Sequence, residues 1–307
     1  MNSKQMMCDL KTGLCGEAEN DTMEMIHFEA PFEKATLYYV TDPICSHCWA
    51  LEPALRRFQL QYGHYFEFHT VMGGLLESWD GFGDAKNGIS KPADVAGHWR
   101  EVGEHSRMPI DGSLWLDNPI QSSYPASRVF KVIQQKDERL AHTFLRRARE
   151  AVFTFNRNIG ERQVLGEIVK QLGLDSMEIL SEADQPQSQN LLEQDFTLAR
   201  RLGVRGFPTI VMMNAENKGV KIVGARSLDE YVQGLEQVLT HATELQPKPQ
   251  PDISSLLPVE KLLFSRELEV LYDLEQSEVS SYVQAELSPE QYEWGEILGE
   301  AYIRGKK

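Results

Sequence analysis

The pattern of hydrophobic and polar positions divides the chain into five stretches of different periodicity. Residues 1–34 are polar and show no apolar repeat, which predicts an N-terminal arm. Residues 35–41 are β-branched and aromatic, as in a buried strand. Apolar residues recur at helical spacing over 44–62, and residues 65–72 alternate as a second strand. A strand–helix–strand order of this kind predicts a parallel sheet.

The middle of the chain predicts an insertion into this α/β domain. The pattern is mostly helical from Ser122 to about Gly203, whereas residues 76–110 are partly loop-like. We therefore expect an inserted helical lobe over residues 76–199. The sheet pattern then resumes with strands over 209–213 and 220–223 and a closing helix over 227–241. The α/β domain is therefore expected to consist of residues 35–75 and 200–245.

A proline-rich stretch separates this domain from the end of the chain. Residues 246–257 contain Pro247, Pro249 and Pro251, which predicts a linker. Residues 258–307 are expected to be helical, with a further helix starting at Ser288 because Pro289 and Gln291 complete a capping pattern.

Composition and charge limit the function classes. The 307 residues are 41% hydrophobic and 25% charged, which is typical of a globular protein. No apolar run reaches the roughly 18 residues of a membrane span, and residues 1–25 do not have the pattern of a secretory signal. We therefore expect a cytoplasmic protein. A net charge of −15 disfavours direct binding to nucleic acid or to an anionic membrane. It would attract a basic protein partner, but it is equally typical of an acidic soluble protein without one.

The acidic residues are concentrated near the C-terminus. Residues 267–300 contain ten acidic side chains and no lysine or arginine. Two interpretations remain open: a solvated helix face, or a surface that docks a basic partner or a protease.

One short motif carries redox chemistry. Cys45-Ser46-His47-Cys48 follows the first predicted strand and opens the first predicted helix. A thiol at a helix N-terminus should have a lowered pKa, because free N–H groups and the helix dipole stabilise the thiolate. Cys45 would then be the nucleophile and Cys48 the resolving thiol, while a protonated His47 would add a second stabilising charge. The alternative is a redox-silent pair on a binding scaffold.

A second motif lies immediately before a predicted strand. Proline is allowed at the first position of a strand, and an X-Pro bond can be cis. Pro208 follows Phe207 in such a position, so a cis-proline loop beside the cysteines is expected. Bulky Phe207 could obstruct an ordinary disulfide substrate.

Other candidate residues have simpler explanations. Cys8 and Cys15, with His27, could form a zinc site, but six intervening residues are more than the usual two to four. A thiol-bearing arm is the default, so no metal or cofactor is assigned. Four aromatic residues of the lobe could line a partner groove or pack in its core, and core packing is favoured. They are Trp79, Phe82, Trp99 and Trp115.

The motifs and their order resemble the DsbA branch of the thioredoxin-like superfamily. The resemblance covers roughly residues 35–244 and rests on Cys45, Cys48 and Pro208, together with the inserted lobe. It implies an α/β thioredoxin-like fold of DsbA type with a helical insertion, followed here by a C-terminal helical extension.

A narrower resemblance spans nearly the whole chain. It is to the SpxH (YjbH) family of Gram-positive bacteria. The residues that carry it are Asp42, Pro43, Cys45, Cys48, Trp49, Leu51, Glu52, Pro53, Tyr62, Gly63, Trp115, Pro119, Ser122, Ser123, Pro208, Thr209 and Leu271–Leu274. Members are cytosolic adaptors that bind the transcription regulator Spx and deliver it to the protease ClpXP. The resemblance therefore implies those two partners and a non-enzymatic role, with thiol oxidation as a modulator.

Two enzymatic alternatives stay open. The first is a cytosolic thiol–disulfide oxidoreductase of DsbA type, which would use Cys45, Cys48 and His47. The second is the glutathione-dependent isomerase branch of the superfamily. Cysteine at position 45 argues against that branch, because serine is typical of its members at the equivalent position.

Overall fold

The computed structural model describes residues 8–9, 14–15, 34–85, 87–239 and 245–306. The chain divides into two units, Met1–Phe32 and Glu33–Lys307. In the first unit, strands β1 (Cys8–Asp9) and β2 (Leu14–Cys15) pair antiparallel, with Cys8 opposite Cys15. The rest of the expected N-terminal arm lies outside the described residues.

The second unit is built on a four-stranded sheet in the order β4-β3-β5-β6. The strands are β3 (Ala35–Thr41), β4 (Phe66–Met72), β5 (Thr209–Met213) and β6 (Gly219–Val223). Strands β3 and β4 are parallel, and β5 runs antiparallel to both β3 and β6. The parallel β3–β4 pair confirms the prediction from the strand–helix–strand pattern.

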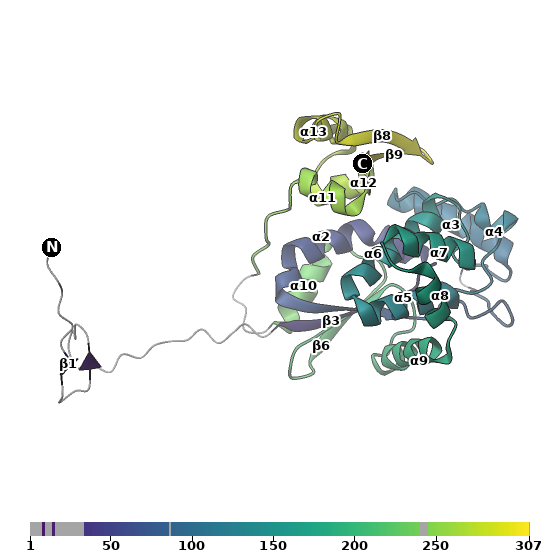
Figure 1. The fold of residues 1–307 in the computed structure, drawn as a ribbon, viewed down its shortest axis with the longest axis horizontal. Coiled ribbons are helices and arrows are strands. Elements are labelled where there is room, and N and C mark those ends of the chain that lie inside the picture. The colour runs from purple at the N-terminus through teal and green to yellow at the C-terminus, as the bar shows by residue number, and fades with distance from the viewer. Residues whose placement is uncertain (1–7, 10–13, 16–33, 86, 240–244, 307) are drawn as a thin grey trace. The chain divides into compact units, whose positions relative to one another are not determined.

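Helices cover both faces of this sheet (Figure 1). Helices α2 (Glu52–Tyr62) and α10 (Leu228–Val238) cover one face, where Phe58 and Tyr231 are fully buried with the sheet residues. Helix α9 (Pro186–Arg201) covers the other face, where Ala199 packs on Val40 and Val71.

The helix expected over 44–62 is divided into two. Helix α1 (Ser46–Ala50) and α2 meet at Leu51, and Pro53 lies in the first turn of α2. Proline is tolerated in a first turn, where its missing N–H has no intrahelical partner, but it cannot continue an earlier helix. The break at Leu51 therefore follows from Pro53.

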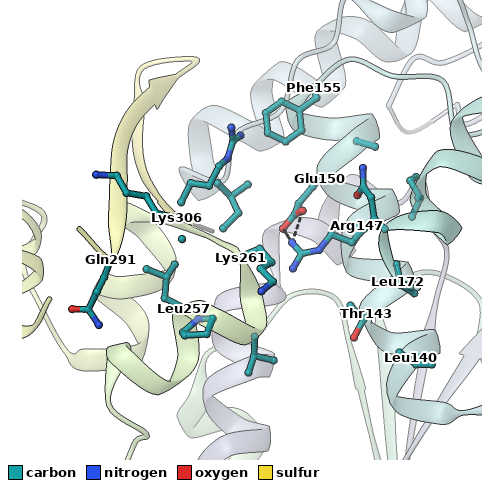
Figure 2. A pocket seen from close by; sticks show the side chains of 18 of the residues that line it. Leu140, Thr143, Arg147, Glu150, Phe155, Leu172, Leu257, Lys261, Gln291 and Lys306 are labelled. Carbon is teal, nitrogen blue, oxygen red and sulfur yellow. Dashed lines mark hydrogen bonds and ion pairs between the residues drawn. The ribbon is translucent and has the colours of Figure 1, made fainter. Parts of the chain in front are cut away.

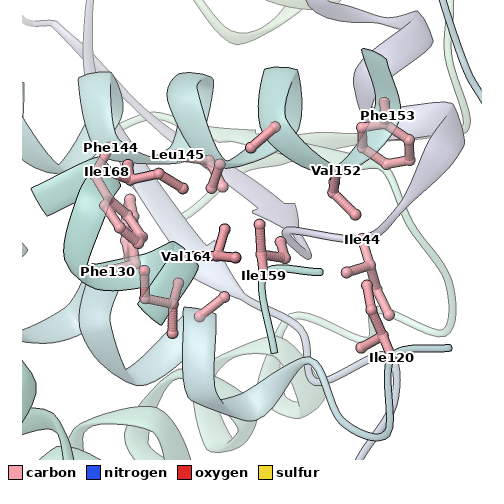
Figure 3. Packing of buried hydrophobic residues seen from close by; sticks show 14 of the residues in the cluster. Ile44, Ile120, Phe130, Phe144, Leu145, Val152, Phe153, Ile159, Val164 and Ile168 are labelled. Atoms are coloured by element: carbon pink, nitrogen blue, oxygen red, sulfur yellow. The ribbon is translucent and has the colours of Figure 1, made fainter. Parts of the chain in front are cut away.

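The chain between β4 and β5 forms the helical lobe. Its helices before α9 are α3 (Pro92–Ser106), α4 (Leu114–Asp117), α5 (Tyr124–Lys136), α6 (Glu138–Arg149), α7 (Arg162–Gln171) and α8 (Ser176–Ala183). A π-helical turn, η2 (Glu150–Thr154), continues α6. Figure 3 shows Phe130, Phe144 and Ile168 of three different helices packed together in the lobe core. Each such side chain contributes about 1.5–3 kcal/mol by burial.

The C-terminal extension is a mixed structure, which corrects the expectation that residues 258–307 are helical. Its helices are α11 (Ile253–Glu260), α12 (Ser265–Tyr272), the 3-10 turn η3 (Gln276–Glu278) and α13 (Val279–Glu286). Strands β7 (Leu262–Phe264), β8 (Tyr292–Ile297) and β9 (Glu300–Gly305) form a sheet in the order β7-β9-β8.

The helix expected from Ser288 does not form, because residues 292–305 make a hairpin instead. Leu298 and Gly299 both have positive φ angles, 53° and 79°, as a tight two-residue hairpin turn requires. The expected linker over 246–257 is also shorter than predicted, since α11 begins at Ile253.

Ion pairs tie the extension to the rest of the unit. Arg146 on α6 makes two hydrogen bonds of 2.8 Å to buried Glu267. Arg107 after α3 binds Glu269 at 2.8 Å and Glu300 at 3.0 Å. Arg57 on α2 pairs with Asp273. Four of the ten acidic residues in 267–300 are therefore engaged within the chain: Glu267, Glu269, Asp273 and Glu300.

Among the residues that the structure describes, no helix is both long and apolar enough to cross a membrane.

Candidate functional site

The CxxC motif lies where β3 ends and α1 begins, as the sequence predicts. Cys45 is the N-cap residue of α1, and the backbone N–H of Cys48 donates a hydrogen bond to its Sγ at 3.2 Å. Both cysteines are free thiols. Cys45 is 5% exposed and Cys48 is fully buried. The first cysteine is therefore nearly as shielded as the second.

Asp42 holds the loop that carries these cysteines. Its Oδ1 accepts the N–H of Ile44 at 3.1 Å, and its Oδ2 accepts the N–H of Leu75 at 2.8 Å. The Ser123 hydroxyl donates to the same Oδ2 at 2.9 Å. The pKa of Asp42 is raised, because burial outweighs these hydrogen bonds. One buried carboxyl group thus joins the cysteine loop to the segment after β4 and to the start of α5.

A buried arginine beneath the motif was not identified from the sequence. Arg149 is fully buried, pairs with Glu52 and donates hydrogen bonds to the Thr41 hydroxyl and to the carbonyl oxygen of Asp42. Its guanidinium lies 5.9 Å from the ring centroid of Tyr39. The sequence signal that could have identified Arg149 is its position on the apolar face of α6, one turn beyond Leu145.

The prediction that the pKa of Cys45 is lowered is wrong. Burial raises the pKa of the Cys45 thiol, and the neighbouring Cys48 raises it further. The lowered pKa belongs to Cys48: burial opposes its ionisation, but a hydrogen bond from Cys45 and the charge of Arg149 outweigh that effect.

His47 is the exposed member of the motif, but it does not provide the expected positive charge. Its ring lies against that of His98, with the centroids 5.4 Å apart and the ring planes tilted by 36°. Desolvation lowers the pKa of His47, and the nearby His98 and His105 lower it further. The side chain is therefore neutral at pH 7 and presents a flat polar ring to solvent.

We expect a histidine titration by NMR to place the pKa of His47 below its ordinary value of about 6.5. His98→Gln should move the value upward, because it removes a neighbouring group that opposes protonation of His47. A titration at or above 6.5 in the unmodified protein would contradict this description of the site.

The Phe207–Pro208 peptide bond is cis. Pro208 is buried, and its carbonyl oxygen accepts the N–H of Gly224 at 2.8 Å. The preceding residues Gly206 and Phe207 lie along the same cavity wall as Cys45. The structure therefore brings the CxxC loop and the cis-proline loop to one surface, as expected from the sequence.

The Phe207 ring packs on the backbone of Gly73. A Cβ atom added to Gly73 would lie 2.0 Å from Cε1 of Phe207, so only glycine leaves room for this ring. The close packing places part of the ring against the end of β4. Phe207 thereby forms a fixed wall of the cavity beside Cys45.

Gly73→Ala should destabilise the protein by about 1–3 kcal/mol, because the added methyl group must displace the Phe207 ring. Adding Phe207→Ala to the variant should recover part of the loss. The matched control is Gly63→Ala, since Gly63 has no atom within 4 Å of an added Cβ and a φ of −61°. Equal thermal melts for the Gly73 and Gly63 variants would contradict the packing argument.

Beside the motif is a cavity of about 480 Å³. Its wall includes all four aromatic residues considered from the sequence: Trp79, Phe82, Trp99 and Trp115. Trp99 and Trp115 are 2% and 3% exposed and contact each other edge to face at 5.1 Å, so they belong to the lobe core. Trp79 and Phe82 are only partly buried. They pack against the same core, so the favoured interpretation of core packing holds for all four, and a role in partner binding stays a prediction.

No cluster of three potential metal ligands occurs within residues 34–85, 87–239 and 245–306 or in the described strands β1 and β2. The zinc hypothesis depends on the side chains of Cys8, Cys15 and His27, which lie outside the described part of the chain.

Comparison with known proteins identifies the broad protein class to which the chain belongs. A thioredoxin family model matches residues 38–233. The fold is similar to that of the cytosolic disulfide reductase DsbM from Pseudomonas aeruginosa, with a TM-score of 0.54, 22% identity and coverage of 67% of this chain and all of the other. The chain is a thioredoxin family protein, and the expected thioredoxin-like fold of DsbA type is confirmed.

The curated relatives narrow the family. The ClpXP adapter protein SpxH of Halalkalibacterium halodurans is 30% identical over 276 residues, which cover 89% of each chain. The protein of the same name from Bacillus subtilis is 28% identical over 257 residues, 82% of each chain. The chain therefore belongs to the SpxH family, as the sequence motifs indicate.

Proposed function

We propose that this protein is a cytoplasmic adaptor that binds an Spx-like transcription regulator and promotes its degradation by ClpXP. The observation that carries the proposal is the length of the alignment between this chain and the curated SpxH relatives. The thioredoxin model ends at residue 233, whereas the H. halodurans relative aligns with 89% of the chain. That alignment is too long to be confined to the redox domain, so it includes part of the C-terminal extension.

The state of the cysteines supports binding rather than turnover. Thiol–disulfide exchange needs an exposed thiolate as the attacking group. Cys45 is 5% exposed, and burial raises the pKa of its thiol. Cys48, which ionises more readily, is fully buried. A general substrate therefore has little access to a nucleophilic sulfur in this conformation.

The same cysteines are suited to a regulatory role. An oxidant such as diamide would take two electrons and two protons from Cys45 and Cys48 and join their sulfur atoms. That bond would replace the hydrogen bond between the two thiol side chains. Cys45 and the neighbouring cis-proline loop, through Gly206 and Phe207, form part of the wall of the 480 Å³ cavity. Oxidation would therefore alter a surface available to a partner.

Isothermal titration with purified Spx tests the binding step. We expect saturable binding by the reduced protein and a changed dissociation constant after diamide treatment. A variant with both Cys45→Ser and Cys48→Ser should bind Spx and lose only the response to diamide. Absence of binding would contradict the adaptor role, while an unchanged diamide response in the double variant would contradict thiol control.

A DsbA-type oxidoreductase is the second candidate, because the CxxC loop and the cis-proline loop share one surface. In that role Cys45 would attack, Cys48 would resolve the mixed disulfide and Pro208 would position the substrate. Insulin reduction measures this activity directly. The adaptor proposal predicts no turnover above the uncatalysed rate, and mixed disulfides trapped by Cys48→Ser would favour the enzyme.

A further inference from the structure

A large cavity lies between the helical lobe and the C-terminal extension, away from the CxxC motif. Its volume is about 870 Å³, within the range of established ligand sites. Helices α6 and α7 and the turn η2 form one side, while α11, β7 and the end of β9 form the other (Figure 2). We call this cavity the lobe–extension groove. It is open to solvent, since Val259, Lys261 and Arg304 on its border are exposed.

The charge of this groove is opposite to that of the protein. Five basic residues line it: Arg147, Arg157, Lys261, Arg304 and Lys306. The single acidic residue of the lining is Glu150, which is buried. Glu150 is already bound to Arg146 at 2.8 Å and to Arg147 at 2.6 Å. In a chain with a net charge of −15, the groove is thus a local positive region.

Two of these cations are available to an incoming anion. Arg147 pairs with Glu150 and Arg157 pairs with Glu167, while Lys306 donates to the carbonyl oxygen of Pro289. Neither Lys261 nor Arg304 forms an ion pair within the described residues, and the carboxylate nearest to Arg304 in the strand register is that of Glu293, directly opposite it on β8. The Arg304 guanidinium lies over the rings of Phe155 and Tyr302, 6.0 and 5.5 Å from their centroids. The two cation–π contacts hold the guanidinium of exposed Arg304 at the border of the groove.

The remaining wall is largely apolar, and its polar residues are Thr143, Gln171, Ser254 and Gln291. Leu140 and Leu172 contribute from the lobe, and Leu257, Pro258 and Val259 contribute from the extension. Val259 is 69% exposed, which is high for a valine. An aqueous anion alone would leave this apolar surface unused, so a fitting occupant must combine carboxylates with at least one apolar side chain.

We propose that the lobe–extension groove binds a short segment of a partner protein in which carboxylates flank an apolar side chain. Arg304 would bind one carboxylate through its paired N–H groups, and Lys261 would bind a second as a point charge. The apolar side chain of the segment would pack against Leu257 and Val259. The inference does not depend on the adaptor function, since it rests on the charge, the volume and the apolar wall of the groove.

Panning of a random dodecapeptide phage library on the immobilised full-length protein tests the proposal. Bound phage are counted on the unmodified protein and on a variant with Lys261→Glu and Arg304→Glu. A second variant with Lys261→Gln and Arg304→Gln removes the two positive charges without adding negative ones. The control is Arg139→Glu on α6, whose side chain is 94% exposed and does not line the groove. Circular dichroism confirms that each variant is folded.

The expected result is enrichment of peptides with aspartate or glutamate next to a leucine, isoleucine or phenylalanine. Synthetic versions should bind the protein and the Arg139→Glu control equally, and at least tenfold more weakly to both groove variants. Peptides without acidic enrichment would overturn the proposal. So would equal binding to the folded groove variants, or recovery of no peptide that depends on Lys261 and Arg304.

Discussion

Glu267→Ala should lower the free energy of unfolding by about 3–5 kcal/mol, because it removes one of the two carboxylates that pair with buried Arg146, the other being Glu150. Glu267 is fully buried and accepts two hydrogen bonds of 2.8 Å from Arg146, which is 5% exposed. It also accepts the backbone N–H of Phe264 at 3.0 Å, and so caps the start of α12. The loss should loosen the attachment of the whole extension. Urea denaturation measures the effect.

The control for this variant is Glu286→Ala, an exposed glutamate of the same extension, for which we expect a change within about 0.5 kcal/mol. The effect of Glu267 should also depend on pH. Burial opposes ionisation, but Arg146 and Arg56 outweigh it and hold the pKa of Glu267 below its usual 4.5. Its contribution is therefore complete above pH 4.5 and is lost as the pH falls through the lower folded-state value. Similar losses for both variants at neutral pH would contradict the buried-pair description.

Trp49→Ala should cost about 3–5 kcal/mol, because it opens a cavity where three parts of the chain meet. Trp49 follows Cys48 and is fully buried. Its indole lies 5.9 Å from the ring of Phe153 in the lobe and 5.8 Å from that of Phe264 in the extension, measured between centroids. Its N–H donates to the carbonyl oxygen of Pro109 at 3.1 Å. Thermal and urea unfolding should both report the loss.

The matched control is Trp294→Ala, since Trp294 is 45% exposed on β8 and should matter little to stability. Trp49→Phe should fall between the two, because it keeps the aromatic packing but leaves the Pro109 carbonyl oxygen with only the Thr154 hydroxyl as a donor. Comparable melting temperatures for Trp49→Ala and Trp294→Ala would refute the central packing role of Trp49.

Much of the α/β domain could be predicted because its patterns are local and strong. Residues 35–41 and 209–213 form the expected strands. A continuous β-branched run and an apolar repeat of 3.6 residues each identify a buried element without knowledge of its neighbours. The place of the CxxC motif at a strand end followed from the same local order.

The interactions that determine the chemistry of the site join residues that are far apart in the sequence. The raised pKa of Cys45 depends on burial beneath loops from distant parts of the chain. Arg149 and the Arg146–Glu267 pair join α6 to residues about 100 positions away, and sequence spacing gives no sign of such pairs. The C-terminal hairpin was missed because Ser288-Pro289 resembles a helix start, whereas the turn at Leu298-Gly299 has no strong local signature.

The most direct test of the adaptor function is a reconstituted degradation assay. Purified Spx is incubated with ClpXP and ATP, with and without this protein, and the half-life of Spx is followed on gels. We predict that the reduced protein accelerates degradation, and that the variant with both Cys45→Ser and Cys48→Ser does so equally under reducing conditions. An Spx half-life that is the same with and without the protein would contradict the account.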